Sequence, residues 1–119
     1  MIFALLLAGH LIGDWVVQSD AQARFKTTRW GANLGHVLTY HLTIFAFLLV
    51  GGVWSWSLFW GLVFVSVPTH AVIDRRWPVE WLLRHTGSVD FAKTPLGILT
   101  ADQALHIAIL ALIASWAVS

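Results

Sequence analysis

Apolar residues form four long runs along the chain, separated by short segments that are polar or rich in glycine. The runs predict helices from roughly Ile2 to Val17, Leu34 to Val53, Trp56 to Ile73 and Ile98 to Val118. We expect all four helices to cross a membrane as one bundle. The first run is short and requires some thinning of the bilayer or support from neighbouring helices.

The composition of the chain agrees with this reading. The chain has 119 residues, of which 58% are apolar and only 11% are charged. This composition predicts an all-α, polytopic membrane protein in which residues 1–119 form a single transmembrane domain. The first run lacks a basic leader and carries His10 and Asp14, so we expect it to be retained rather than cleaved as a signal peptide. The chain has no cysteine, so nitrogen and oxygen atoms must hold any bound metal.

All seven basic residues lie in the first and third connecting segments. These residues are Arg24, Lys26, Arg29, Arg75, Arg76, Arg84 and Lys93. The positive-inside rule assigns both segments to the cytoplasm, which leaves both termini and the Gly51-Gly52 turn outside. Because topology explains where the basic residues lie, we expect no nucleic-acid partner.

The third connecting segment carries the pattern of an additional helix. Pro78 suits a helix start, residues 79–85 form a short run, and Gly87 suits a stop. This pattern predicts a short interfacial helix lying on the membrane, with an ordinary polar connection as the alternative.

Three histidine–aspartate pairs lie inside the predicted spans at a spacing of one helical turn. The pairs are His10 with Asp14, His70 with Asp74, and Asp102 with His106. The last pair is reversed in order, and its helix runs in the opposite direction. The three histidines should therefore share one layer and the three aspartates another, with the histidines roughly 5–12 Å inside the cytoplasmic helix ends. His36 lies near the start of the second span, on the same side of the membrane.

These side chains predict a metal site. His10, His36, His70 and His106, together with Asp14, Asp74 and Asp102, could hold one divalent ion or two ions sharing a carboxylate. Imidazole and carboxylate ligands suit several metals, and we favour zinc or manganese. In the alternative reading, each aspartate accepts a hydrogen bond from its own histidine and joins helices without a metal.

Six further residues are candidates for supporting the site or contacting a substrate. Gln18 and Gln103 continue the polar stripes, and Tyr40 lies one turn from His36. Three basic residues are expected around the cytoplasmic opening of the site: Lys26, Arg75 and Arg76. There they would fix the orientation of the chain in the membrane and attract a phosphate or lipid headgroup. Ordinary interface polarity is the alternative for the glutamines, and a membrane anchor for the tyrosine.

Two histidines are expected outside the site. His41 points about 140° away from His36 around its helix, so we interpret it as a packing or interhelical hydrogen-bonding residue. His85 is expected on the surface.

The ordered motifs as a whole resemble a known family. They are His10-Leu11-Ile12-Gly13-Asp14-Trp15, then Gln18, Asp20, Lys26 and His36, then His70-Ala71-Val72-Ile73-Asp74-Arg75, then Asp102-Gln103 and His106. The chain resembles the small bacterial and phage membrane proteins grouped as domain of unknown function 3307. The matching functional positions are His10, Asp14, Gln18, Lys26, His36, His70, Asp74, Asp102, Gln103 and His106. The resemblance implies a bacterial inner-membrane location and no known activity. More loosely, the chain is similar to inner-membrane proteins described as metal-dependent hydrolases.

The preferred hypothesis is a membrane-embedded, metal-dependent hydrolase acting on a lipid or other amphipathic substrate at the cytoplasmic interface. An aspartate not bound to metal, among Asp14, Asp74 and Asp102, would serve as the catalytic base. Metal or proton transport is one alternative, and a noncatalytic structural or partner-binding role is another. Membrane lipids are the expected surroundings, and the apolar exterior also permits a homo-oligomer.

Overall fold

The computed structural model describes residues 1–119 and is built entirely from helices. The elements in chain order are α1 (Ile2–Trp15), α2 (Asp20–Phe25), α3 (Trp30–Val50), α4 (Trp56–Gly61), the π-helical turn η1 (Leu62–Ser66), α5 (Val67–Ile73), α6 (Trp77–His85), the 3₁₀ turn η2 (Phe91–Lys93) and α7 (Pro95–Ala117). The all-α prediction is confirmed.

Three helices, rather than the predicted four, are long and apolar enough to cross a membrane. They are α3, the continuous helix Trp56–Ile73 formed by α4, η1 and α5, and α7. The prediction of a fourth crossing fails because α1 ends at Trp15 after 14 residues. At 1.5 Å per residue it spans about 21 Å, which is shorter than a hydrocarbon core of about 30 Å.

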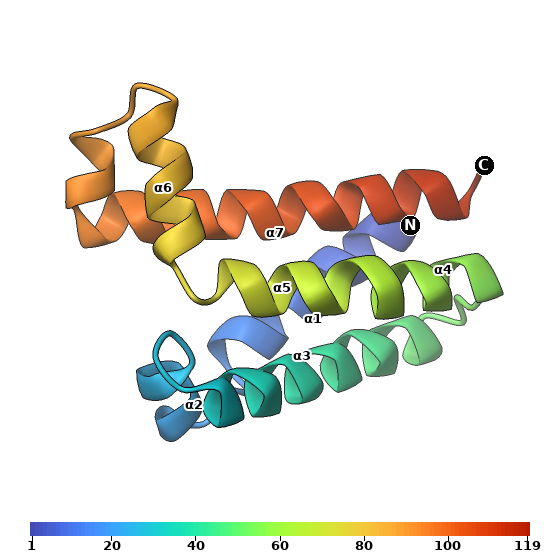
Figure 1. Ribbon diagram of the computed structural model, residues 1–119. Coiled ribbons are helices and arrows are strands. Elements are labelled where there is room, and N and C mark those ends of the chain that lie inside the picture. Colours follow the sequence, from blue (N-terminus) through green and yellow to red (C-terminus); the bar gives the residue numbers. More distant parts are fainter.

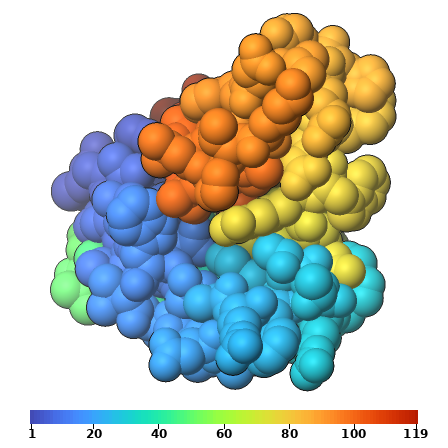
Figure 2. Space-filling model, turned by 90° about the vertical axis from the view of Figure 1, so that its left-hand side faces the viewer, coloured from blue at the N-terminus to red at the C-terminus, as the bar shows by residue number.

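The four long helical segments form a bundle in which α1 still takes a full place. Helix α1 packs against α3 and α7, and the α4–α5 helix packs against the same two neighbours from the other side. Figure 1 shows the chain termini at one end of the bundle and both α2 and α6 at the opposite end. The segments that carry all seven basic residues therefore lie together, as predicted, and Figure 2 shows them covering that end.

Polar residues lie inside the bundle and large apolar residues lie on its outside. Eleven polar or charged residues are buried, while residues such as Leu38, Leu42, Phe64 and Leu112 are 58–71% exposed. A soluble monomer rarely exposes so much contiguous apolar surface to water. This inverted distribution agrees with a lipid-facing exterior.

Two glycines let α1 approach α3 closely. A Cβ atom on Gly9 would lie 3.0 Å from the Ile44 Cα atom, and one on Gly13 would lie 3.2 Å from the Tyr40 ring. Small residues four positions apart are a common device for bringing membrane helices into contact. The close approach carries Asp14, the residue after Gly13, toward the face of α3 that bears His36.

The π-helical turn before α5 has a local cause in Pro68. Proline has no backbone N–H and cannot donate to the carbonyl of Phe64, so the helical hydrogen-bond ladder shifts there. The Val67 N–H accordingly bonds to the Leu62 carbonyl. The span nevertheless keeps its predicted bounds of Trp56 and Ile73.

The connecting segments contain one helix that was predicted, α6, and one that was not, α2. The short helix predicted in the third segment is present as α6, and Gly87 follows it at φ +88°. Helix α2 lies in the first connecting segment, for which no helix was predicted, and its signal was a capping box between Ser19 and Gln22. Helix α7 begins at Pro95, before the predicted start at Ile98, because Thr94 caps it.

Candidate metal centre

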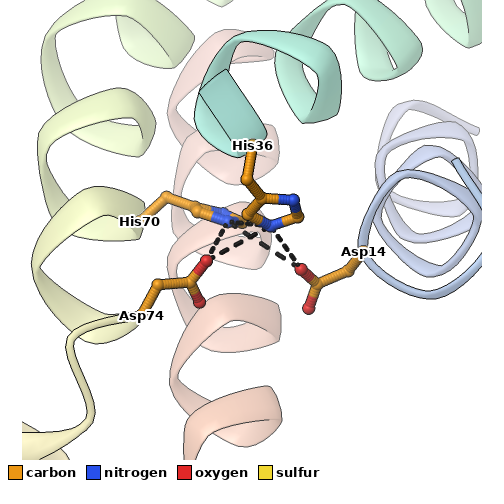
Figure 3. Close-up of side chains that lie close together, drawn as sticks. All are labelled: Asp14, His36, His70 and Asp74. Carbon is orange, nitrogen blue, oxygen red and sulfur yellow. Dashed lines mark hydrogen bonds and ion pairs between the residues drawn. The ribbon is translucent and has the colours of Figure 1, made fainter. Parts of the chain in front are cut away.

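Four buried side chains from three helices converge near the basic end of the bundle. Asp14 comes from α1, His36 from α3, His70 from α5, and Asp74 caps the end of α5 (Figure 3). One potential ligand atom from each lies within 4.8 Å of the others. The His36 Nε2 atom lies 2.8 Å from Asp14 Oδ1 and 3.2 Å from Asp74 Oδ2, and His70 Nε2 lies 3.0 Å from Asp74 Oδ2. We call these four residues the first cluster, and they could hold a metal ion.

The first cluster contains more acceptors than its own hydrogen bonds satisfy. Both oxygens of Asp74 are buried without a hydrogen bond of acceptable geometry, although nitrogen atoms lie nearby. The Nε2 atoms of His36 and His70 face each other at 3.2 Å, and both Nδ1 atoms lack partners. Buried polar groups in proteins are nearly always paired. Nitrogen and oxygen atoms that point at one another in this way suit a cation between them.

A second cluster adjoins the first and shares a member with it. One ligand atom each from Asp14, Asp102 and His106 lies within 4.8 Å of the others, and all three residues are buried. The His106 Nδ1 atom lies 2.9 Å from the Asp102 carbonyl oxygen and 2.9 Å from Asp102 Oδ1. Donation from Nδ1 leaves the lone pair on Nε2, which has no partner and lies 3.6 Å from Asp74 Oδ1.

Lys26 reaches into the first cluster from the segment after α2. Its ammonium group lies 3.3 Å from Asp14 Oδ1, 3.4 Å from Asp74 Oδ2 and 3.4 Å from His36 Nε2. The residue is only 7% exposed, so it belongs to the interior rather than to the rim where topology alone would leave it. A buried lysine needs charged partners, and the two carboxylates supply them.

The other two predicted supporting residues in this area, Tyr40 and Gln103, meet at His10. The amide nitrogen of Gln103 donates to Asp14 Oδ2 at 2.7 Å, and its oxygen accepts from His10 Nε2 at 2.9 Å. The His10 Nδ1 atom therefore accepts from the Tyr40 hydroxyl at 2.9 Å. Both ring nitrogens of His10 are engaged in this way, and His10 lies beside the two clusters rather than in either of them.

The intrahelical pairs form in two of the three predicted cases. His70 contacts Asp74, and His106 contacts Asp102. His10 turns instead to Tyr40 and Gln103, while Asp14 turns across to His36 on α3. The spacing alone favoured a third pair within one helix, between His10 and Asp14. In the structure, both residues instead form hydrogen bonds to other helices.

The net charge of the interior is negative. Asp14, Asp74 and Asp102 are buried together with Lys26 as the only buried basic side chain apart from histidine. With neutral histidines, these groups leave two uncompensated negative charges in a medium that stabilises isolated charges poorly. One divalent cation would neutralise the interior.

The remaining predicted residues lie away from the clusters. Gln18 makes no hydrogen bond to either cluster, and its buried oxygen has no partner. The Arg75 guanidinium stacks 4.4 Å from the Trp30 ring and donates to the Thr28 carbonyl, so it joins connecting segments. His41 forms the expected interhelical hydrogen bond, with its Nε2 atom 2.9 Å from Ser66 Oγ. His85 is exposed as expected.

Sequence reasoning missed the contribution of Asn33. Its side chain is fully buried and donates to the backbone carbonyls of Lys26 and Ala71. These bonds attach the backbone of Lys26 to α5 and so help to direct its ammonium group at Asp74. An asparagine at the start of an apolar run was the available signal, but its partners are distant in the sequence.

Comparison with protein families matches residues 2–119 to the family described as protein of unknown function (DUF3307). The chain belongs to this family. The predicted resemblance to DUF3307 is thus confirmed over essentially the whole chain. No curated protein and no solved structure matches the chain, so the looser similarity to metal-dependent hydrolases gains no support from these comparisons. The function of this DUF3307 protein is therefore inferred from the two buried clusters.

Proposed function

We propose that this DUF3307 protein is a membrane-embedded, metal-dependent hydrolase that acts on a lipid or other amphipathic substrate. The observation that carries the proposal is the first cluster, where two carboxylates and two imidazoles converge and leave both Asp74 oxygens and both Nδ1 atoms without hydrogen-bond partners. Two nitrogen and two oxygen ligands suit zinc or manganese, the metals we favour.

The residues of the clusters supply the parts that hydrolysis requires. A divalent ion held there would polarise the scissile ester and make a water molecule more acidic. The water oxygen bonds to the ester carbon or phosphorus, and the bond to the alcohol oxygen breaks with its electron pair on that oxygen. One water proton goes to the alcohol and the other to a cluster carboxylate that does not hold the ion.

The position of the clusters supports an amphipathic substrate. They lie near the end of the bundle covered by the basic segments, and this end is cytoplasmic by the positive-inside rule. A shallow groove of about 420 Å³ between α1 and α7 is lined by apolar residues together with Thr100 and Gln103. Because Gln103 contacts Asp14, this groove brings the lipid-facing surface to the edge of the site.

A transport function fits the same residues less well. The half of the bundle toward the termini is filled by an apolar core that includes Leu6, Ile44, Leu48, Leu58 and Leu110. Apart from the His41–Ser66 hydrogen bond, no buried polar pair between helices lies outside the cluster region. An ion would thus meet an apolar barrier beyond the clusters.

A noncatalytic structural role has one specific observation in its favour. Lys26 pairs with both Asp14 and Asp74, so part of the buried negative charge is balanced without a metal. In that case the clusters would serve to join α1, α3 and α5. The metal content of the purified protein distinguishes the two functions.

The first experiment is elemental analysis of the detergent-purified full chain after exposure to zinc or manganese. We expect stoichiometric metal in the wild-type protein and its loss in a His70→Ala, Asp102→Ala double variant. His41→Ala is the matched control, because His41 is also a buried histidine but lies outside both clusters. It should keep the metal.

Hydrolysis is then tested with metal-loaded protein and short-chain phospholipids in micelles. Product release that requires both the metal and His70 supports the proposal. Wild-type protein that holds no stoichiometric metal even after reloading, with an unchanged His70→Ala variant, would overturn it in favour of the structural role.

A further inference from the structure

We propose that the two clusters together form a two-metal centre that takes a phosphate ester. This inference rests on the proposed function and adds to it the second cluster as a metal site, together with a substrate class. The starting observation is that Asp14 belongs to both clusters.

The oxygens of the two inner carboxylates divide between the clusters. Asp14 Oδ1 faces His36, whereas Asp14 Oδ2 faces Gln103 on α7. Asp74 Oδ2 faces His36 and His70, whereas Asp74 Oδ1 faces His106. Carboxylates oriented in this way can each contribute one oxygen to each of two ions. Two-metal hydrolytic sites hold their ions about 3.5–4 Å apart, a distance that shared carboxylates permit.

The second cluster has its own unsatisfied ligand. His106 is 3% exposed, and its Nε2 atom is buried with no hydrogen-bond partner while Asp102 holds its Nδ1 atom. Metal-binding histidines typically donate their other ring nitrogen to a carboxylate or a carbonyl, which fixes the orientation of the ring. His106 has both kinds of acceptor at 2.9 Å, so the ring is already held as a ligand.

In each cluster a nitrogen donor occupies the space between carboxylates. The Lys26 ammonium lies between Asp14 and Asp74 in the first cluster. In the second, the Gln103 amide nitrogen lies 2.7 Å from Asp14 Oδ2 and 3.4 Å from Asp102 Oδ1. We expect the two ions to lie near these two nitrogen atoms, between the same carboxylates.

The charge of the loaded site favours an anionic substrate. Two divalent cations, the ammonium of Lys26 and three carboxylates leave two positive charges. A phosphate monoester would balance this charge. Water adds its oxygen to phosphorus, the P–O bond to the alcohol breaks with its electron pair on the alcohol oxygen, and that oxygen takes one proton from water. The products are inorganic phosphate and an alcohol.

Manganese loading of the detergent-purified full chain tests the second site independently of activity. We expect about two Mn²⁺ ions per wild-type chain and an electron paramagnetic resonance spectrum of two exchange-coupled ions. Asp102→Asn should retain one ion with the hyperfine pattern of an isolated Mn²⁺, and His41→Ala should behave as wild type. One isolated ion in the wild-type protein would overturn the two-metal centre while leaving the proposed function intact. No bound metal at all would overturn both.

The substrate class is tested with inorganic phosphate, glycerol phosphate and short-chain phosphatidic acid. We expect inorganic phosphate to alter the coupled spectrum, and the wild-type protein, but not Asp102→Asn, to release phosphate from an ester. Release from phosphatidic acid identifies a membrane substrate, and release only from glycerol phosphate identifies a soluble one. An unaltered spectrum together with no release from either ester would overturn the phosphate assignment.

Discussion

The two halves of the bundle are built on opposite principles. Toward the termini, a core of apolar side chains such as Leu48, Leu62 and Leu110 packs between the helices. Toward the basic segments, the space between the same helices is filled by histidines, aspartates and one lysine. The first half needs only complementary shapes, whereas the second requires every charge to be paired or neutralised.

The two halves therefore contribute differently to stability. The apolar half holds the helices together by packing, while the polar half contains buried acceptors without partners, such as Asp74 Oδ1 and His106 Nε2. Unsatisfied buried acceptors cost stability unless a ligand completes them. Variants in the two halves should therefore separate metal binding from folding.

The largest expected effect is the loss of metal from an Asp74→Asn variant. Asp74 directs an oxygen at each cluster, and the amide is a much weaker ligand than the carboxylate. Metal affinity should fall more than about 100-fold, because even residues that only support metal ligands contribute 10- to 100-fold. Isothermal titration with Zn²⁺ measures this, and retained affinity would show that Asp74 is no ligand.

Replacement of Lys26 by methionine should change metal binding in the opposite direction. Loss of the ammonium removes repulsion on a cation in the first cluster, so affinity should rise by at least about tenfold. The metal-free protein should lose about 3–5 kcal/mol of stability, because Asp14 and Asp74 lose their charged partner. Thermal unfolding with and without Zn²⁺ reports both changes. A fall in metal affinity would instead indicate that Lys26 helps to hold the metal.

Leu110→Ala should damage the apolar half alone. Leu110 is 1% exposed within the core, and truncation of such a residue costs about 2–5 kcal/mol. Unfolding in detergent should show this loss, while elemental analysis should give an unchanged metal content per folded chain. Reduced metal content would mean that the two halves are not independent.

The smallest expected effect is that of Tyr40→Phe. The change removes the hydroxyl that donates to His10 and keeps the buried ring. The loss should be about 0.5–1.5 kcal/mol of stability, with metal stoichiometry unchanged. A complete loss of metal would reveal that the His10 network controls the clusters, despite lying beside them.

The sequence by itself determined the helical class, the bounds of the Trp56–Ile73 span, the segregation of basic residues, and the histidines and aspartates that gather in the interior. These features follow from local patterns: apolar runs of sufficient length, charges confined to two segments, and one-turn spacing of histidine and aspartate. The family resemblance followed from the order of the same motifs.

The tertiary structure decided which of those residues pair. His10 and Asp14 share a helical face, but contacts from α3 and α7 separate them. Lys26 and Asn33 join the interior because the segment after α2 folds back over α3 and α5. The sharing of Asp14 between two clusters also depends on packing. The physical reason is that a sequence specifies the period of each helix, whereas the partners of a buried charge depend on the rotation and depth of its neighbours.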